Sequence, residues 1–94
     1  MSYYNKELKI IFWNTRSISR RIEDVEILLK SVDILICVET WLNQNSFLYN
    51  HSFPGFVILR HDRDYSRGGG IIFIIRRNLA FVEINNLNPS NPFI

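Results

Sequence analysis

Two segments decide the fold, Ile10-Ile11-Phe12-Trp13-Asn14 and Ile34-Leu35-Ile36-Cys37-Val38-Glu39, because each is an apolar run that ends on a polar side chain. Runs rich in β-branched and aromatic residues predict buried strands. In open α/β sheets, ligands bind beyond the carboxyl ends of the strands, where a rigid core fixes the side chains. Asn14 and Glu39 are therefore the first candidates for functional residues.

Between these segments the apolar residues change to a helical period. They recur at steps of four, three, four and three, at Ile18, Ile22, Val25, Leu29 and Val32. We expect Ser17 or Ser19 to cap the start of this helix. Glu23 and Asp24 should lie near its positive end, and Lys30 in its last turn. A right-handed crossover through the helix makes the two flanking strands parallel.

The second half of the chain predicts further strands. We expect residues 56–60 and 71–75 to pair as an antiparallel hairpin, and residues 80–84 are a candidate fifth strand. The run Gly68-Gly69-Gly70 leads into a strand, whereas a phosphate-binding loop opens a helix, so turn geometry explains it better. Residues 85–94 form an irregular tail rich in Asn and Pro.

Size and composition narrow the class of protein. The chain has 94 residues, enough for one small domain, and its 47% hydrophobic content excludes disorder. A net charge of +2 permits a phosphate-bearing partner without requiring one. Cys37 is the single cysteine, which excludes an internal disulfide and predicts a small buried hydrophobe in a reducing compartment. The polar N-terminus and short apolar runs indicate no signal peptide, no membrane span and an intracellular location, nuclear or cytoplasmic.

The strands do not alternate between apolar and polar residues, so both faces of the predicted sheet should be covered. One helix covers one face only. The other face would be a broad apolar surface of a kind that soluble monomers rarely expose. We therefore expect a second layer, most simply a second sheet, contributed by further chain or by a partner molecule.

Five segments of the sequence together match a known family. They are Leu8 to Ser17, Asp33-Ile34-Leu35, Glu39-Thr40-Trp41-Leu42, Arg60-His61-Asp62-Arg63 and Gly68-Gly69-Gly70. These segments resemble the endonuclease/exonuclease/phosphatase superfamily, and among its branches the endonuclease domain of non-LTR retrotransposons. The resemblance covers about residues 8–81.

This resemblance implies an α/β fold in which residues 1–94 form a single partial domain. The domain would be the first half of a four-layer α/β/β/α sandwich, with one mixed sheet of four or five strands and one main helix. It also implies that Asn14 helps to position the scissile phosphate and the metal-site groups, and that Glu39 is a direct ligand of Mg²⁺ (or Mn²⁺). The chemistry agrees, because Mg²⁺ prefers oxygen ligands and is usually held by one or two carboxylates together with substrate phosphates.

The chain departs from the family pattern in its second half. The family's Asp-x-Asn and Ser-Asp-His segments, which supply the general base and further metal ligands, do not occur in this sequence. Without a base, water remains a poor nucleophile. We expect the missing C-terminal half of the domain to be needed for activity, DNA to be the partner of the parent protein, and no small-molecule cofactor.

Several interpretations stay open at this point. Arg16, Arg60, Arg63 and Arg67 could contact a DNA backbone or simply be solvated. Trp41 is expected to pack beneath the site rather than stack on a base. The alternatives to a DNA endonuclease fragment are a phosphoinositide or sphingolipid phosphoesterase of the same fold, and a non-catalytic retroelement remnant that binds nucleic acid weakly.

Overall fold

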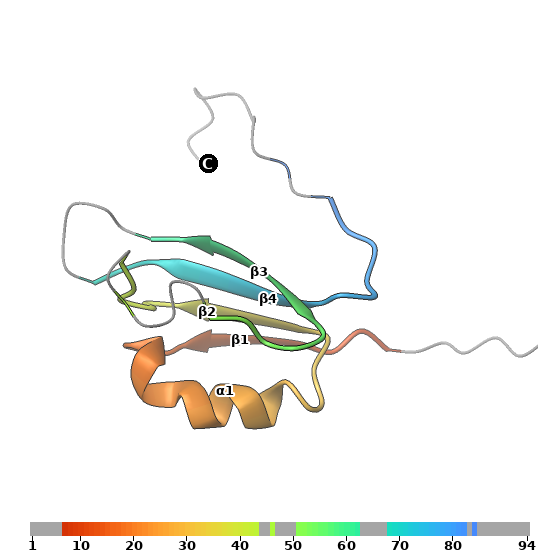
Figure 1. The fold of residues 1–94 in the computed structure, drawn as a ribbon, viewed down its shortest axis with the longest axis horizontal. Coiled ribbons are helices and arrows are strands. Elements are labelled where there is room, and N and C mark those ends of the chain that lie inside the picture. Colours follow the sequence, from red (N-terminus) through yellow and green to blue (C-terminus); the bar gives the residue numbers. More distant parts are fainter. Residues whose placement is uncertain (1–6, 44–45, 47–50, 63–67, 83, 85–94) are drawn as a thin grey trace, which may run out of the picture.

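The computed structural model describes residues 7–43, 46, 51–62, 68–82 and 84. In this part of the chain, a four-stranded sheet carries a short helical segment on one face (Figure 1). The elements in chain order are β1 (Ile10–Asn14), the 3-10 helix η1 (Ile18–Arg21), α1 (Ile22–Leu28), β2 (Ile34–Val38), β3 (Phe56–His61) and β4 (Ile71–Arg76).

The sheet is mixed, with the strand order β1-β2-β4-β3. β1 and β2 pair in parallel through the η1–α1 crossover, with Asn14 in register with Val38. β4 runs antiparallel to both β2 and β3. The predicted α/β class, the parallel pair and the antiparallel hairpin are therefore confirmed.

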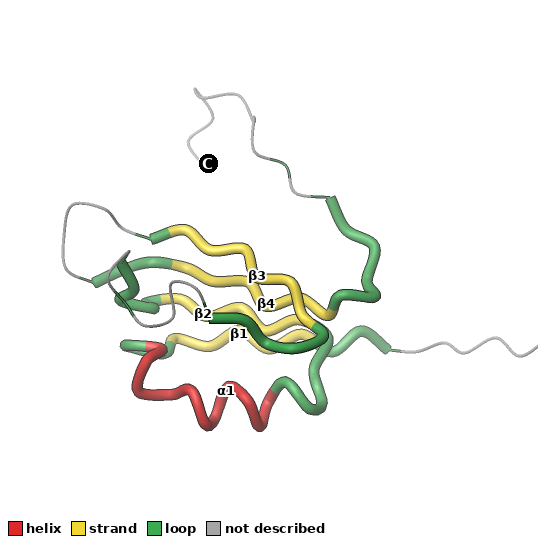
Figure 2. Tube along the Cα trace, in the orientation of Figure 1, coloured by secondary structure: helices red, strands yellow, loops and turns green. Residues whose placement is uncertain are grey.

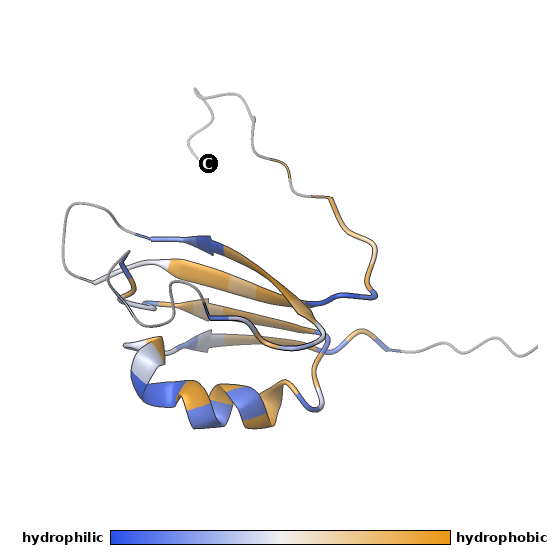
Figure 3. Ribbon diagram, in the orientation of Figure 1, coloured by the Kyte–Doolittle hydropathy of each residue, from blue (hydrophilic) through white to orange (hydrophobic). Residues whose placement is uncertain are grey.

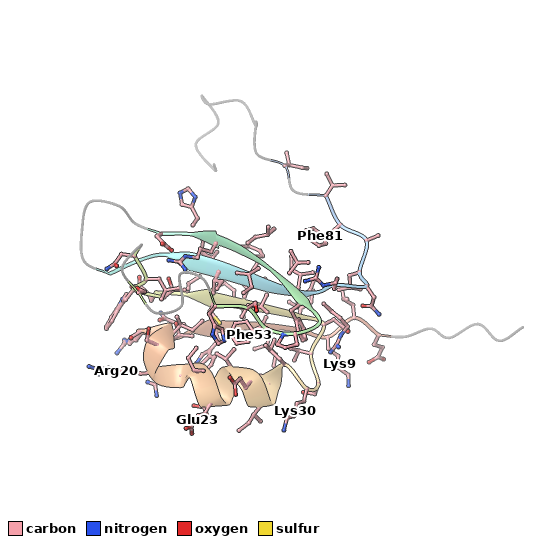
Figure 4. All side chains as sticks on the ribbon, viewed as in Figure 1. Lys9, Arg20, Glu23, Lys30, Phe53 and Phe81 are labelled. Carbon is pink, nitrogen blue, oxygen red and sulfur yellow. The ribbon has the colours of Figure 1, made fainter. Side chains whose placement is uncertain are left out.

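The helical segment is shorter than its apolar pattern predicted. A 3-10 turn precedes α1, which ends at Leu28, so Lys30 follows the helix instead of lying in its last turn. The Ser17 side chain makes no capping hydrogen bond, and Ser19 lies inside η1. The Ser17 N–H donates to the Glu39 carbonyl. Glu23 does lie in the first turn of α1, and Glu23 and Lys30 both point away from the sheet (Figure 4).

The predicted helix face forms the core against one side of the sheet. Ile18 and Val25 are fully buried, and they belong to one cluster with residues of β2 and β4. The hydropathy colours in Figure 3 show this arrangement, with alternating residues along α1 and an apolar β4. Cys37 is also fully buried there, and desolvation raises the pKa of its thiol to about 12. The prediction that Cys37 is a small buried hydrophobe is confirmed.

The opposite face of the sheet is apolar. In the described part of the chain it is exposed over β1, whereas Ile75 of β4 is only 6% exposed. Ile10 and Phe12 of β1 are 51% and 66% exposed, and the register continues their rows onto Ile34 and Ile36 of β2. A groove of about 390 Å³ lies further along this open face, lined by residues that include Leu59, Phe73, Ile75, Phe81 and Val82. The prediction that one helix leaves an apolar face uncovered is confirmed.

The prediction of a fifth strand at 80–84 is wrong for the residues that the structure describes there, 80–82 and 84, which have no regular secondary structure. After β4 a turn places the Leu79 amide on the Arg76 carbonyl, and the chain then leaves the sheet without regular structure (Figure 2). Val82 and Ile84 are 84% and 68% exposed. Apolar residues form a strand only where a neighbouring edge accepts their backbone hydrogen bonds. In this segment Phe81 and Val82 instead line the groove beside Phe73 and Ile75 of β4. The tail 85–94 lies outside the described residues.

Two arginines of the sheet form ion pairs. Arg60 is ion-paired with Asp62, and Arg76 with Asp33.

In the part of the chain that the structure describes, no helix is long and apolar enough to cross a bilayer.

Candidate active site

The two predicted site residues lie at the same edge of the sheet. β1 ends at Asn14, opposite Val38, and Glu39 follows directly at the carboxyl end of the neighbouring parallel strand. Asn14 is exposed and shares the open face with Ile10 and Phe12, since side chains alternate along a strand. This juxtaposition of Asn14 and Glu39 is the arrangement that the sequence predicted.

Backbone hydrogen bonds hold the two loops together beyond the ends of the strands. The Thr15 and Ser17 amides donate to the Val38 and Glu39 carbonyls at 3.0 and 2.9 Å. The buried Thr15 hydroxyl donates to the same Val38 carbonyl at 3.0 Å. The residues that follow Asn14 are therefore fixed against the segment that carries Glu39.

The Glu39 side chain is held from the other side by two N–H donors. Its Oε2 accepts from the Trp41 indole Nε1 at 2.9 Å and from the Gly69 amide at 3.0 Å. The Trp41 amide in turn donates to the Gly69 carbonyl at 3.0 Å. Glu39 is half-buried, and both Glu39 and Trp41 adopt positive φ angles, 53° and 57°. Non-glycine residues in this left-handed region carry strain of the kind found at functional sites.

The three glycines let the chain before β4 approach this loop closely. Gly70 has φ of 91°, and a Cβ at this position would collide with Thr40 Oγ1. A Cβ at Gly68 would lie 3.6 Å from Trp41 Nε1. The sequence prediction of turn geometry for Gly68-Gly69-Gly70 is confirmed, and the structure adds that Gly69 binds the Glu39 carboxylate.

Two of the four arginines proposed as DNA contacts lie in the described part of the chain, and they lie in different parts of the fold. Arg16 is exposed in the loop just beyond Asn14. Arg60 lies in β3, where it pairs with Asp62 at 2.7 Å and donates to the Asn43 carbonyl at 3.0 Å. Arg63 and Arg67 lie outside the described residues. The structure thus brings Arg16 to the edge that holds Asn14 and engages Arg60 within the protein.

Trp41 is the participant that sequence reasoning missed. It was expected to pack beneath the site, yet its side chain is 43% exposed and donates to Glu39. The sequence holds a partial signal, because Trp41 stands two residues after Glu39 in Glu39-Thr40-Trp41. The signal is incomplete without the loop conformation, which turns the indole back toward the carboxylate.

The donor set fits a hard cation. A carboxylate from Glu39 and an amide oxygen from Asn14 are the ligand types that Mg²⁺ takes, with water and substrate phosphate completing its coordination. Among the described residues no group of three or more His, Cys, Asp or Glu side chains is placed to hold a metal. Any cation at this edge would therefore depend on oxygen ligands from beyond the protein groups described.

Comparison with solved structures shows the class that this fold defines. No protein-family model matches the chain. The fold is similar to a 3'-5' exonuclease, NExo, from Neisseria meningitidis, with a TM-score of 0.59 and 27% identity over 73% of this chain and 27% of that chain. The fold is also similar to a NExo variant (D146N), described as a 3' phosphatase bound to a product DNA hairpin. The TM-score is 0.59 and the sequence identity 25%, over 74% of this chain and 28% of that chain. For an AP endonuclease from Archaeoglobus fulgidus, the TM-score is 0.57 and the sequence identity 28%, over 72% of this chain and 27% of that chain.

These neighbours confirm the resemblance to the endonuclease/exonuclease/phosphatase superfamily. A curated protein from a transposon is also similar to the chain. The chain is 31% identical over 74 residues to a probable RNA-directed DNA polymerase from transposon BS of Drosophila melanogaster, a match that covers 77% of this chain and 8% of the relative. The chain spans about a quarter of the solved structures and a small fraction of this relative.

Proposed function

We propose that this chain is the N-terminal part of a Mg²⁺- or Mn²⁺-dependent phosphodiesterase domain that cleaves DNA in a retrotransposon protein. One observation carries the proposal: Asn14 and Glu39 lie at the same edge of the sheet, with the carboxylate oriented by two N–H donors. The similarity to nucleases supports the reaction class, and the match to a transposon protein supports the parent.

The two side chains have complementary roles in this proposal. Glu39 supplies the negative charge and oxygen ligand for the cation, and the Asn14 amide donates to a phosphate oxygen while its carbonyl oxygen accepts from water or from another donor. When bound, the cation would offset negative charge that develops on the phosphate and on the leaving oxygen. The backbone bonds between the two loops keep both groups in place before the substrate arrives.

DNA is the substrate that the comparisons favour over a phosphoinositide or sphingolipid. One neighbour holds a product DNA hairpin, and another is named as an AP endonuclease. We assign phosphate contacts outside the cleavage point to Arg16, Arg60, Arg63 and Arg67, since such contacts require only charge within reach. Arg16 is best placed among the described ones, because Arg60 would first have to exchange Asp62 for the phosphate.

The uncovered apolar face supports the second part of the proposal, that this chain is one portion of a larger domain. Phe12 and Ile10 stand exposed on the same face as Asn14. We assign that face to the remaining half of the domain, which would also bring the general base and further ligands. The chain alone is then expected to lack cleavage activity.

The proposal is tested with supercoiled plasmid and a fluorescent DNA duplex. The purified chain should bind DNA in a salt-sensitive manner, more tightly with Mg²⁺ than without, and should not nick the plasmid. Glu39→Gln should remove the Mg²⁺-dependent part of binding and leave the salt-sensitive part. Binding that ignores both Mg²⁺ and this substitution would favour the non-catalytic remnant, and Glu39-dependent nicking would show that the chain alone suffices.

A further inference from the structure

We infer that Trp41 is a positioning residue for Glu39, and that its indole N–H, together with the Gly69 amide, sets the affinity of this edge for a divalent cation. The inference rests on the proposed function, because it concerns the same carboxylate. It goes further because it names the groups that orient the carboxylate. It also gives Trp41 a role other than packing.

The first argument is the geometry around one oxygen atom. Trp41 Nε1 and the Gly69 amide both donate to Oε2 of Glu39, at 2.9 and 3.0 Å. Two donors on one oxygen fix the position of that oxygen and restrict the directions in which the carboxylate can turn. Groups that hydrogen-bond to metal ligands orient them in this way, and their removal typically weakens metal binding by about 10- to 100-fold.

The second argument is the position of the indole. The Trp41 side chain is 43% exposed, whereas the core residues Ile18, Val25 and Leu35 are completely buried. A hydrogen bond at an exposed site adds little to folding stability, because water competes for both partners. Packing therefore accounts poorly for a tryptophan at the rim of the sheet, and orientation of Glu39 accounts for it well.

The third argument is the backbone conformation that places the indole there. Glu39 and Trp41 both have positive φ, on either side of the buried Thr40. A left-handed conformation is unfavourable for residues other than glycine, because Cβ comes too close to the following carbonyl oxygen. The Trp41 amide is held by the Gly69 carbonyl at 3.0 Å, so the same glycine residue supports both the loop and the carboxylate.

The experiment removes the N–H donor without changing the size of the ring. In the full chain, Trp41 is replaced by benzothienylalanine, in which sulfur stands in place of the indole N–H. Mn²⁺ binding is followed by the loss of the free-ion EPR signal. We expect Mn²⁺ to bind about tenfold more weakly. Replacement by 7-azatryptophan, which retains the N–H, should restore the affinity.

Controls separate this inference from the proposed function. The same benzothienylalanine replacement at Trp13, which packs against the core, should leave Mn²⁺ affinity unchanged. In Glu39→Gln, saturable Mn²⁺ binding should disappear. If Glu39→Gln abolishes binding while the ring replacement at Trp41 does not alter it, the positioning role is overturned and the metal site stands. If Glu39→Gln binds Mn²⁺ like the natural chain, the metal site of the proposed function is overturned.

A second readout needs no metal. The indole N–H of Trp41 and the amide of Gly69 should both shift in the NMR spectrum of Glu39→Gln, whereas the Trp13 indole N–H should not. In the benzothienylalanine protein, the Gly69 amide should also shift, because the carboxylate loses one of its two donors. Unchanged resonances in both proteins would contradict the two hydrogen bonds to the Glu39 carboxylate.

Discussion

Asp33 and Arg76 form an ion pair at the end of the sheet opposite to Asn14 and Glu39, with 3.1 Å between Arg76 Nε and Asp33 Oδ1. The other carboxylate oxygen of Asp33 accepts from the Lys9 amide at 3.0 Å. Arg76 also donates to the Val32 carbonyl at 2.7 Å. This pair ties the entry of β1, the end of the helical crossover and the end of β4 together.

Asp33→Ala should lower the free energy of unfolding by about 2–3 kcal/mol, because Arg76 and the Lys9 amide would lose a shared partner. The Asp33 side chain is 7% exposed and that of Arg76 is 29% exposed, so the loss should fall below that of a fully buried pair. Urea denaturation measures it. Glu26→Ala, at an exposed position of α1, is the control, and a loss below about 0.5 kcal/mol for Asp33→Ala would contradict the role of the pair.

Gly70→Ala and Gly55→Ala form a matched pair of substitutions. Both glycines have positive φ, 91° and 84°, but only the Cβ at Gly70 would meet Thr40 Oγ1, whereas nothing lies within 4 Å at Gly55. Gly55→Ala should cost about 1 kcal/mol of stability from backbone strain, and Gly70→Ala at least about 2 kcal/mol, because a steric collision is added.

Thermal or urea unfolding of the two alanine variants checks this difference. Thr40→Ala should remove part of the added cost in a double variant with Gly70→Ala, since the colliding oxygen is gone. Equal losses at Gly55 and Gly70 would show that the loop before β4 does not pack against Thr40 as described.

Cys37 should react with thiol reagents only after unfolding. Burial raises the pKa of its thiol from 9.0 to about 12, so the folded protein keeps the thiol proton at a pH where the unfolded chain has lost it. This contribution to stability is complete below about pH 9 and is lost as the pH rises toward 12. Reaction with a disulfide reagent at pH 8, with and without urea, measures the protection, and rapid labelling of the folded chain would contradict it.

The pH dependence has its own comparison. Between pH 9 and 12, unfolding free energy should fall more steeply in the natural chain than in Cys37→Ala, since other groups titrate equally in both proteins. Parallel curves would mean that the thiol does not contribute.

Phe12→Lys should leave the fold intact and reduce the binding of a hydrophobic dye such as ANS. Phe12 is 66% exposed on the open face, so the change removes apolar surface without disturbing the core. Ile27→Lys is the control, because Ile27 is 61% exposed but belongs to α1. Dye binding that falls equally in both variants would contradict the open face as the main exposed apolar surface.

Sequence reasoning reached the local parts of this protein. The apolar runs ending at Asn14 and Glu39 predicted two parallel strands with polar ends, because contiguous apolar residues are typical of a strand that is covered on both faces, whereas a strand buried on one face alternates. The helical period predicted the buried residues Ile18 and Val25 correctly, since that pattern depends only on neighbours along the chain. The apolar segment at 80–84 misled for the same reason: the pattern does not show whether a sheet edge is available to it.

The tertiary structure decided the contacts that connect distant segments. One of the two hydrogen bonds to the Glu39 carboxylate comes from Gly69, which reaches the carboxylate only because β4 pairs with β2. The indole of Trp41 turns back through positive φ angles that this pairing supports. Arg76 forms an ion pair with Asp33, which lies 43 residues earlier in the sequence, because the sheet brings the end of β4 beside the start of β2. Sequence alone thus determined which residues stand at the strand ends, and the pairing of strands determined how those residues are held.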